Sequence, residues 1–265
     1  MLRALPRALR LSRPWRSPGA RDCASNAKTG TPEIQVHALT GPDKGITEVL
    51  MNRPHARNAL GNVFVSELLE ALAQLREDQQ VRVLIFRSAV KGVFCAGADL
   101  KEREQMSAVE VGIFVQRLRG LMSEIASSAV MGLIETTRGL LPGAGGTQRL
   151  PRCLGVALAK ELIFTGRRVN GMQAHELGLV NHAVAQNEEG NAAYHRALAL
   201  AQEILPQAPI AVRLGKVAID RGMEVDIASG MAIEHMCYAQ NIPTQDRLEG
   251  MAAFREKRPP KFVGK

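Results

Sequence analysis

A single carboxylate ahead of a glycine-rich turn is the feature of this sequence best suited to chemistry. Glu135 precedes the turn at residues 143–146, and Thr147 and Gln148 follow it with the pattern of a helix's first turn. Glycines let a backbone approach a ligand closely, and a helix start presents unpaired N–H groups to negative charge. A carboxylate beside such a turn suits a general acid or base, whereas the simpler interpretation is a solvated Glu near an ordinary turn.

Ordinary apolar and charged fractions indicate a globular protein with a sizeable core. Of the 265 residues, 46% are apolar and 23% are charged, and a chain of this length forms one large domain or two small ones. The formal net charge is +8, but residues 1–22 hold six Arg and one acidic residue and account for +5 of it. The remaining +3 gives no reason to expect that the body of the chain binds nucleic acid.

The first thirty or so residues have the composition of a targeting segment. They are rich in Arg, poor in acids and carry Ser12 and Ser17, and their leucines give a loose apolar face at helical spacing. The arginines interrupt the unbroken apolar centre that a secretory signal needs. We interpret residues 1–30 as a mitochondrial transit peptide and expect the protein in the matrix, with a disordered basic tail as the alternative.

The remaining composition argues against a metal, a nucleotide and a membrane span. The four Cys are far apart without a C-x-x-C pair, which is typical of reduced thiols inside the cell, and the six His show no ligand spacing. The turn at 143–146 lacks the Gly-Lys-Ser/Thr of a P-loop and the full G-x-G-x-x-G spacing. We see no long uncharged apolar run and therefore expect no transmembrane helix.

Hydrophobic periodicity predicts an α/β front part and a mainly helical rear part. A loop of small residues spans 92–101, and Ser107 with Glu110 forms a capping-box pattern at the start of a helix. The predicted strands are 34–39, 46–51, 81–86 and 179–185, and the predicted helices are 63–76, 107 to about 125, 156–164, 171–177, 189–205, 210–221, 226–240 and 246–257.

Four motifs in a fixed order carry a family resemblance over residues 34–265. They are Asn52-Arg53-Pro54 with Asn58-Ala59-Leu60, then Phe-Cys-Ala-Gly-Ala-Asp-Leu-Lys-Glu at 94–102, then Glu135 with Leu-Pro-Gly-Ala-Gly-Gly-Thr-Gln-Arg-Leu-Pro at 141–151, and finally residues 246–258. Each alone is compatible with chance, but together they are specific. The chain resembles the enoyl-CoA hydratase/isomerase (crotonase) superfamily.

The resemblance implies both an architecture and an assembly. The fold would be a spiral of ββα turns over residues 31–200, after the leader at 1–30, followed by a helical segment at 201–265. In the family such a segment packs trimers, which often pair into hexamers. We therefore expect a homo-oligomer.

The resemblance also implies a reaction, the addition of water across an α,β-unsaturated acyl-CoA thioester in mitochondrial fatty-acid or branched-chain acyl-CoA metabolism. Two backbone N–H groups would stabilise the thioester oxygen, and two glutamates would position water and move protons. Ala98 matches one N–H donor and Glu135 one glutamate. Coenzyme A is part of the substrate, so no separate cofactor is expected. The positions matching the path of coenzyme A or the acyl pocket are Ala96, Asp99, Leu100, Lys101, Gly143, Phe254 and Lys257.

One departure from the family pattern puts activity in question. Between Ser128 and Ala129 the pattern expects a strand, a helix start with the second glutamate and another strand, roughly thirty residues or one β/α turn. Without them the second N–H donor and the partner carboxylate are missing. Losing one such donor typically costs about 100- to 1,000-fold in rate, and losing a positioned acid or base about 100- to 10,000-fold. We expect hydratase activity to be strongly impaired.

Two other functions remain open. The chain could be a non-catalytic subunit that assembles with intact relatives through its C-terminal helices. RNA binding, which one hydratase of the family performs, is the weaker alternative. The predicted helix at 63–76 offers Glu67 and Glu70 and only Arg76 as a cation, whereas binding through phosphates needs several cations.

Overall fold

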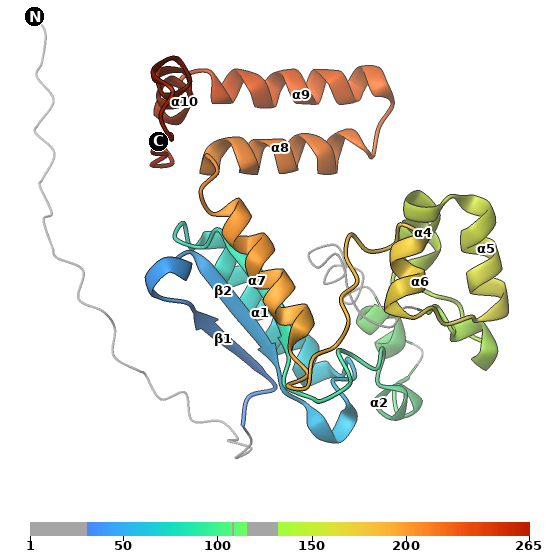
Figure 1. Ribbon diagram of the computed structural model, residues 1–265. Helices are drawn as coiled ribbons and strands as arrows, with labels where there is room; N and C mark the ends of the chain where they lie inside the picture. Colours follow the sequence, from blue (N-terminus) through green and yellow to red (C-terminus); the bar gives the residue numbers. More distant parts are fainter. Residues whose placement is uncertain (1–30, 108, 116–131) are drawn as a thin grey trace, which may run out of the picture. The chain divides into compact units, whose positions relative to one another are not determined.

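The computed structural model describes residues 31–107, 109–115 and 132–265. The chain divides into two units, Met1–Thr31 and Pro32–Lys265, and the description below concerns the second (Figure 1). Three predictions lie outside the described residues: the leader at 1–30, the far end of the helix that starts at Ser107, and the junction between Ser128 and Ala129.

A three-stranded sheet and one crossover helix form the front of the fold. The strands are in the order β1-β2-β3, with β1 and β2 antiparallel and β2 and β3 parallel. A parallel pair needs a crossover connection, which α1 supplies. The predicted strands and helix are confirmed to within two residues at each end. The elements are β1 (Ile34–Ala38), β2 (Ile46–Met51), α1 (Asn62–Glu77) and β3 (Val83–Ser88), with short 3-10 turns η1 (Gly41–Asp43) and η2 (Pro54–Ala56) between them.

Helices cover both faces of the sheet. Phe64 and Leu68 of α1 pack with Val49 on one face. On the other face, Ile46 and Ile85 pack against Ala201 of α7 (Ala192–Ile204). Figure 1 shows the sheet between α1 and α7. Because side chains alternate along a strand, covering both faces explains why β2 is buried at nearly every position.

A short helix and a capped helix follow β3. The loop predicted at 92–101 is correct up to its last two residues, where α2 (Leu100–Glu104) begins. The capping box is confirmed, because Ser107 N–H donates to Glu110 Oε2 at 2.8 Å and Glu110 N–H donates to Ser107 Oγ at 3.4 Å. Residues 109–115 are helical.

The strand predicted at 179–185 is wrong, because its apolar residues cover a helix instead. Leu179 N–H and Val180 N–H both donate to the carbonyl of Ala174 in α6 (Gly171–Glu176), and their side chains pack against the cluster that contains Leu162 and Ala174. The segment is irregular and pairs with no strand in the ranges that the structure describes. The neighbouring elements are η3 (Glu135–Arg138), α4 (Gly146–Leu154), α5 (Val156–Thr165) and α6 (Gly171–Glu176).

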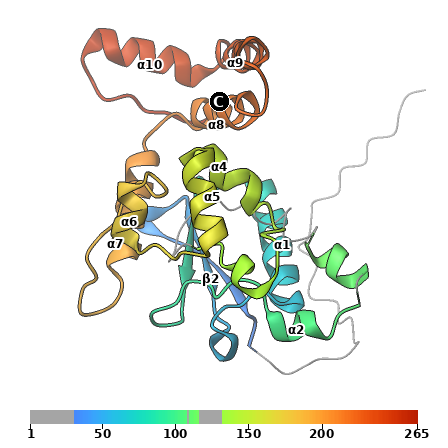
Figure 2. The ribbon, with the colours of Figure 1, turned by 90° about the vertical axis from the view of Figure 1, so that its right-hand side faces the viewer.

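Three helices form the rear part, as predicted. They are α8 (Pro209–Gly222), α9 (Ile227–Asn241) and α10 (Gln245–Glu256). α8 and α9 lie side by side (Figure 2), and Gly222 and Gly230 let them approach, because a Cβ on Gly230 would lie 3.3 Å from the Gly222 oxygen. In the part of the chain that the structure describes, no helix is long and apolar enough to cross a membrane. The predicted division at residue 200 stays a prediction.

Candidate functional site

The loop that contains Ala98 is pinned to the segment before α1. Leu60 N–H donates to the Gly97 oxygen at 2.8 Å, and Asp99 N–H donates to the Leu60 oxygen at 3.2 Å. This is a parallel bridge between Leu60 and Ala98. In such a bridge the bonds to Leu60 are made by the neighbours of Ala98, so the N–H of Ala98 itself points the other way.

The N–H of Ala98 is available to a ligand. It makes no hydrogen bond to any other residue that the structure describes, and Ala98 is half-buried. A donor held by its surroundings but left unpaired is what stabilisation of a developing oxyanion requires. The geometry therefore suits the role that the resemblance implies for this residue.

An unusual turn before α1 supplies further anchors for the loop. Arg57 and Asn58 both have positive φ, 53° and 55°, a conformation that Asn tolerates better than most residues. Ala96 N–H donates to the Arg57 oxygen at 3.1 Å. Asn58 is fully buried, and its amide donates to Ser88 Oγ at 2.9 Å and to the Phe94 oxygen at 3.0 Å. The turn thus fixes the start of the loop, with Ala96 itself exposed.

A buried arginine joins this turn to the other end of the loop. Arg53 forms three ion pairs: Nη1 with Asp99 Oδ2 at 2.8 Å, Nη2 with Glu102 Oε1 at 2.9 Å, and Nε with Glu33 Oε1 at 2.9 Å. The sequence alone marks Asn52-Arg53-Pro54 only as part of the family resemblance. Its structural role depends on partners distant in sequence, so no local signal could have revealed it.

The carboxylate of Asp99 is used by the protein itself. It accepts from the backbone N–H groups of Lys101 and Glu102 and so caps α2. Burial alone would raise the pKa of Asp99, but the hydrogen bond from Arg53 and those from the two N–H groups outweigh it and lower the pKa below its usual value. Among the residues predicted to contact coenzyme A, Asp99 could therefore do so only through its backbone atoms. Leu100 and Lys101 are exposed on α2 and could do so through their side chains.

Glu135 has one buried carboxylate oxygen without a partner. Its Oε2 is buried and accepts no hydrogen bond in the described part of the chain. The 3-10 helix η3, which Glu135 begins, is held by Thr136 Oγ1, which donates to the Ile163 oxygen of α5 at 2.6 Å. An unpaired buried oxygen is costly, and such an exception calls for a functional explanation. An acceptor kept for a ligand or a proton is the simplest one.

The glycine-rich turn packs directly against the segment that carries Glu135. Gly145 has φ +94° and caps α4, which confirms the helix start predicted at Thr147 and Gln148. A Cβ on Gly146 would lie 2.7 Å from the side chain of Leu133. Only glycine therefore allows α4 to approach the residues just before Glu135 this closely.

The turn and the Ala98 loop border the same hydrophobic cluster. Ala144 of the turn and Phe94 of the loop both pack on the cluster that contains Phe114. Gly143 lies near the helix at 109–115, because a Cβ there would be 3.6 Å from Val115 Cγ1. The structure thus brings the glycine-rich turn and the start of the Ala98 loop to one part of the core.

Cys95, beside Ala98, is unsuited to nucleophilic chemistry. Burial raises the pKa of its thiol, and the hydrogen bond that Gly97 N–H donates to Sγ at 3.4 Å only partly offsets this. The thiolate is the reactive form of cysteine, so this shift makes the thiol less reactive, and the side chain packs on the same hydrophobic cluster as Phe94. Among the described residues, no group of His, Cys, Asp and Glu could hold a metal ion.

Phe254 and Lys257 have no described contact with Ala98 or Glu135. Both belong to the end of α10, where Phe254 is 86% exposed and Lys257 adopts a left-handed conformation. In the described part of the chain, no hydrogen bond or ion pair joins α10 to the Ala98 loop. Their predicted contact with the nucleotide end of coenzyme A stays a prediction.

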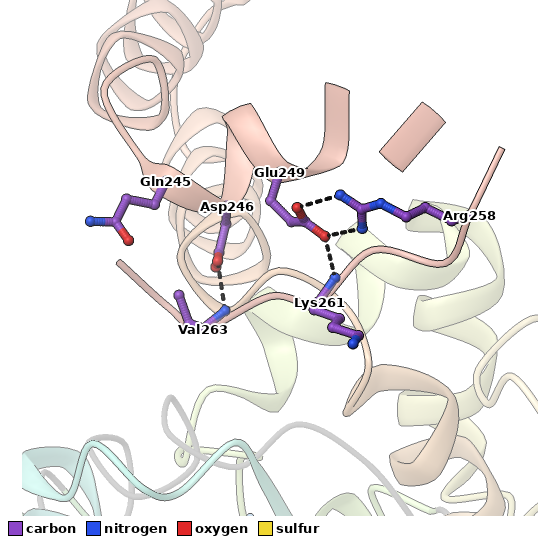
Figure 3. A pocket seen from close by; sticks show the side chains of 6 residues that line it. All are labelled: Gln245, Asp246, Glu249, Arg258, Lys261 and Val263. Carbon is purple, nitrogen blue, oxygen red and sulfur yellow. Dashed lines mark hydrogen bonds and ion pairs between the residues drawn. The ribbon is translucent and has the colours of Figure 1, made fainter. Parts of the chain in front are cut away.

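A pocket of about 440 Å³ lies between α10 and the C-terminal tail (Figure 3). Asp246 Oδ1 accepts from Val263 N–H at 2.7 Å, and Glu249 accepts from the Arg258 guanidinium and from Lys261 N–H. The bond from Arg258 is the main cause that lowers the pKa of Glu249 to about 2. The polar groups of the pocket thus hold the tail to the helix.

A known family model matches this chain in two overlapping segments. A family model described as enoyl-CoA hydratase/isomerase matches residues 41–126 and 120–265. The two matched segments overlap at 120–126, a few residues before the predicted junction at Ser128 and Ala129.

Named relatives match nearly the whole chain. A mouse protein named enoyl-CoA hydratase domain-containing protein 2, mitochondrial, is 82% identical over 296 residues, which cover all of both chains. Because this chain has 265 residues, roughly thirty alignment positions have no counterpart here, as the gap of about one β/α turn predicts. Human methylglutaconyl-CoA hydratase, mitochondrial, is 46% identical and is matched over 92% of this chain and 81% of its own.

A solved structure has the same fold. The crystal structure of enoyl-CoA hydratase from Bacillus anthracis superimposes with a TM-score of 0.80 at 37% identity, covering 88% of this chain and all of that chain. The predicted crotonase-like fold, an α/β core followed by a helical C-terminal region, is therefore confirmed.

Proposed function

The chain belongs to the enoyl-CoA hydratase/isomerase family, and we propose that it binds an acyl-CoA thioester between Ala98 and Glu135 but hydrates it poorly. The observation that carries the proposal is the Ala98 N–H, which is held by its neighbours and has no hydrogen-bond partner among the described residues. Coenzyme A arrives as part of the substrate, and the reaction needs no other cofactor.

The chemistry assigns one task to each of the two groups. The thioester oxygen accepts a hydrogen bond from Ala98 N–H, which strengthens as the oxygen becomes enolate-like. The oxygen of a water molecule bonds to the β-carbon, and Glu135 Oε2 accepts the proton that the water loses. The α-carbon then takes a proton from the same carboxyl group, which returns to its starting state.

The missing segment limits turnover more than binding. Family members with the full pattern have a second N–H donor and a second glutamate, so in this chain one donor and one carboxylate serve alone. Each loss typically lowers the rate about 100-fold or more. Ground-state binding of coenzyme A uses many weaker contacts, and we expect it to fall less.

Hydration of crotonyl-CoA tests the proposal directly. The decline of the conjugated thioester absorbance is followed for this chain and for the same chain carrying the extra segment of the mouse relative. We expect kcat/KM to be at least about 1,000-fold higher with the segment restored. Equal rates would refute the impairment.

Binding of butyryl-CoA, which is saturated and cannot be hydrated, tests the site without turnover. We expect dissociation constants within about ten-fold of each other for the two chains, since a ten-fold change is only 1.4 kcal/mol. Glu135→Gln in the restored chain should remove turnover, whereas Glu176→Gln at an exposed position should not. No binding of butyryl-CoA to this chain at millimolar concentration would refute an acyl-CoA site.

Assembly is the second part of the proposal. We propose a homo-oligomer, a trimer or hexamer, or in its place a non-catalytic subunit that joins intact relatives. This is supported by large apolar side chains exposed on the rear helices, which a monomer would leave in water. They include Val217, Ile219, Met223, Ile227, Met231, Met236, Leu248, Met251 and Phe254. RNA binding has no comparable support.

A mitochondrial location is proposed on the names of the relatives, which include the word, and on the composition of residues 1–30. Import into isolated mitochondria, with protection from added protease after the outer membrane is opened, would place the protein in the matrix. The matched control lacks residues 1–30 and should stay outside. Equal import of both forms would contradict the transit peptide.

A further inference from the structure

We propose that Arg53 is a positioning residue that aims and polarises the Ala98 N–H through two intervening peptide groups. The inference rests on the proposed function, since it concerns the donor that meets the thioester oxygen. Arg53 itself has no contact with the substrate in this scheme. Its effect is carried by hydrogen bonds within the protein.

A continuous hydrogen-bonded chain links the guanidinium to the donor. Arg53 Nη1 donates to the Ala59 oxygen at 2.8 Å. The N–H of that same peptide group belongs to Leu60 and donates to the Gly97 oxygen at 2.8 Å. The N–H of this second peptide group belongs to Ala98. Because a trans peptide holds its N–H opposite its C=O, the direction of the Ala98 N–H is set by the bond at Gly97.

The chain has a positive charge at one end and the donor at the other. Hydrogen bonds arranged in series polarise one another, and a charged donor makes a stronger bond than a neutral one. The guanidinium of Arg53 withdraws electron density from the Ala59 carbonyl, and each peptide group passes part of this effect on. The Ala98 N–H therefore becomes a better donor to a developing oxyanion.

Two carboxylates fix where the Nη atoms of Arg53 lie, and a third contacts only Nε, which takes no part in the hydrogen-bonded chain. Asp99 and Glu102 bind its two Nη atoms from the loop side, and Glu33 binds Nε. Glu102 Oε2 also accepts from Asn62 N–H at 2.8 Å, which ties the cluster to the start of α1. Burial alone would lower the pKa of Arg53, but the bond to Asp99 and the other carboxylates raise it, so the positive charge is secure.

Gly61 leaves room for this arrangement. A Cβ at that position would collide with Glu102 Oε1 and lie 2.9 Å from Arg53 Nη1. Gly61→Ala therefore displaces the ends of the Glu102 and Arg53 side chains without removing any charge. Arg53→Lys keeps the charge but loses the planar set of donors that reaches several acceptors together.

Glu33→Gln is the matched control. It removes one ion pair of Arg53 on the side that does not belong to the loop. The chain from Arg53 through Ala59 to Ala98 stays intact in this variant. If the variants act only by lowering stability, Glu33→Gln should have the same effect as Arg53→Lys and Gly61→Ala. If they act by misplacing the Ala98 N–H, Glu33→Gln should have no effect.

The probe is 4-(dimethylamino)cinnamoyl-CoA, in which an amine is conjugated to the thioester carbonyl. Its absorption moves to longer wavelength as the carbonyl oxygen is polarised by a hydrogen bond. With the full chain we expect a red shift on binding. Arg53→Lys and Gly61→Ala should lose at least half of that shift while the dissociation constant changes less than ten-fold, and Glu33→Gln should keep it. An unchanged shift in Arg53→Lys, or an equal loss in Glu33→Gln, would overturn the proposal.

Amide hydrogen exchange without ligand separates this inference from the proposed function. If the unaltered chain does not bind the probe, the proposed function fails, and exchange still reports on positioning. In Arg53→Lys the amides of Leu60 and Asp99, which hold the two peptide groups flanking Ala98, should exchange at least ten-fold faster, and Glu33→Gln should leave them unchanged. Equal protection in Arg53→Lys and the unaltered chain would overturn the inference.

Discussion

Arg53 and Asp99 form an ion pair, with 2.8 Å between Nη1 and Oδ2, in which both side chains are buried. Asp99 follows Ala98 directly, and its carboxylate also caps α2. The pair therefore connects the end of β2 to the residue beside the proposed donor. Removing one partner of a buried pair leaves the other charge uncompensated, which is the costly case.

The first prediction concerns the stability of this pair at different pH values. The pKa of Asp99 is lower in the folded protein than its usual 3.8. The stabilisation from this pair is therefore complete above the pKa of Asp99 in the unfolded chain. It is lost as the pH falls through the pKa of Asp99 in the folded protein. Asp99→Asn should lower the free energy of unfolding by about 3 kcal/mol at pH 7.

Urea unfolding at pH 7, 5 and 3 measures the effect. The difference between the two proteins in free energy of unfolding should be equal at pH 7 and pH 5 and smaller at pH 3, where Asp99 is protonated in much of the unfolded chain. Glu104→Gln, at an exposed position of α2, is the control. Its free energy of unfolding should stay close to that of the unaltered chain at all three pH values. A difference that grows towards pH 3 would contradict the assigned shift.

The second prediction compares the reactivity of two cysteines in different surroundings. Burial raises the pKa of the Cys95 thiol, whereas Cys153 is exposed on α4. Because the thiolate reacts, iodoacetamide at pH 8 should modify Cys153 at least about ten-fold faster than Cys95. Peptide mass spectrometry of timed samples measures both rates, and the difference should vanish in urea. Faster labelling of Cys95 in the folded protein would show that it is activated.

The parts of the fold that sequence could predict are those decided locally. The alternation at β1 and the helical period of α1 depend on neighbouring residues, as does the capping box of Ser107 and Glu110. The strand predicted at 179–185 failed because an apolar run looks alike whether it pairs with a strand or covers a helix. Only the packing against α6 decides between them.

The residues of the candidate site could also be predicted only in part from the sequence. Resemblance assigned roles to Ala98 and Glu135, and within the described part of the chain the Ala98 N–H and the Glu135 Oε2 have no partner, which agrees with those roles. It assigned none to Arg53, whose connection to Ala98 passes through Ala59 and Leu60 and depends on a bridge between segments distant in sequence. Hydrogen bonds of this kind follow from the folded backbone and leave no periodic signal.

The third prediction concerns the C-terminal tail. Asp246 is 2% exposed and accepts from the N–H groups of Val263 and Gly264, at 2.7 and 2.8 Å. Bonds to a charged acceptor are worth about 1.5–3 kcal/mol each, so Asp246→Ala should release the tail. Carboxypeptidase should then remove residues 259–265 at least about ten-fold faster.

Glu249→Gln is the comparison for this variant. Its pair with Arg258 is more exposed, and exposed pairs contribute less because water screens them. The tail should therefore digest more slowly in Glu249→Gln than in Asp246→Ala. The reverse order would mean that the Arg258 pair, and not the buried Asp246, holds the tail.

The fourth prediction concerns the surface of α9. Apolar residues surround this helix and do not form a single stripe, and a helix of that kind is normally covered on most sides. α8 covers one side, while Ile227 is 81% and Met231 56% exposed on the rest. The two residues are four apart and therefore share one face. A second copy of the chain, or an intact relative, would bury that face.

Met231→Asp places a charge at the centre of this surface, where burial in an interface would be expensive. We expect the unaltered chain to sediment as three or six copies at micromolar concentration, and Met231→Asp to sediment as a monomer. Phe164→Asp is the matched control, because Phe164 is a comparably exposed apolar residue on α5, and it should leave the assembly unchanged. Since α9 belongs to the rear part of the chain, Met231→Asp should also leave the red shift of the bound cinnamoyl thioester intact. A monomer in the unaltered chain, or dissociation by Phe164→Asp alone, would assign the exposed surface of α9 to something other than self-assembly.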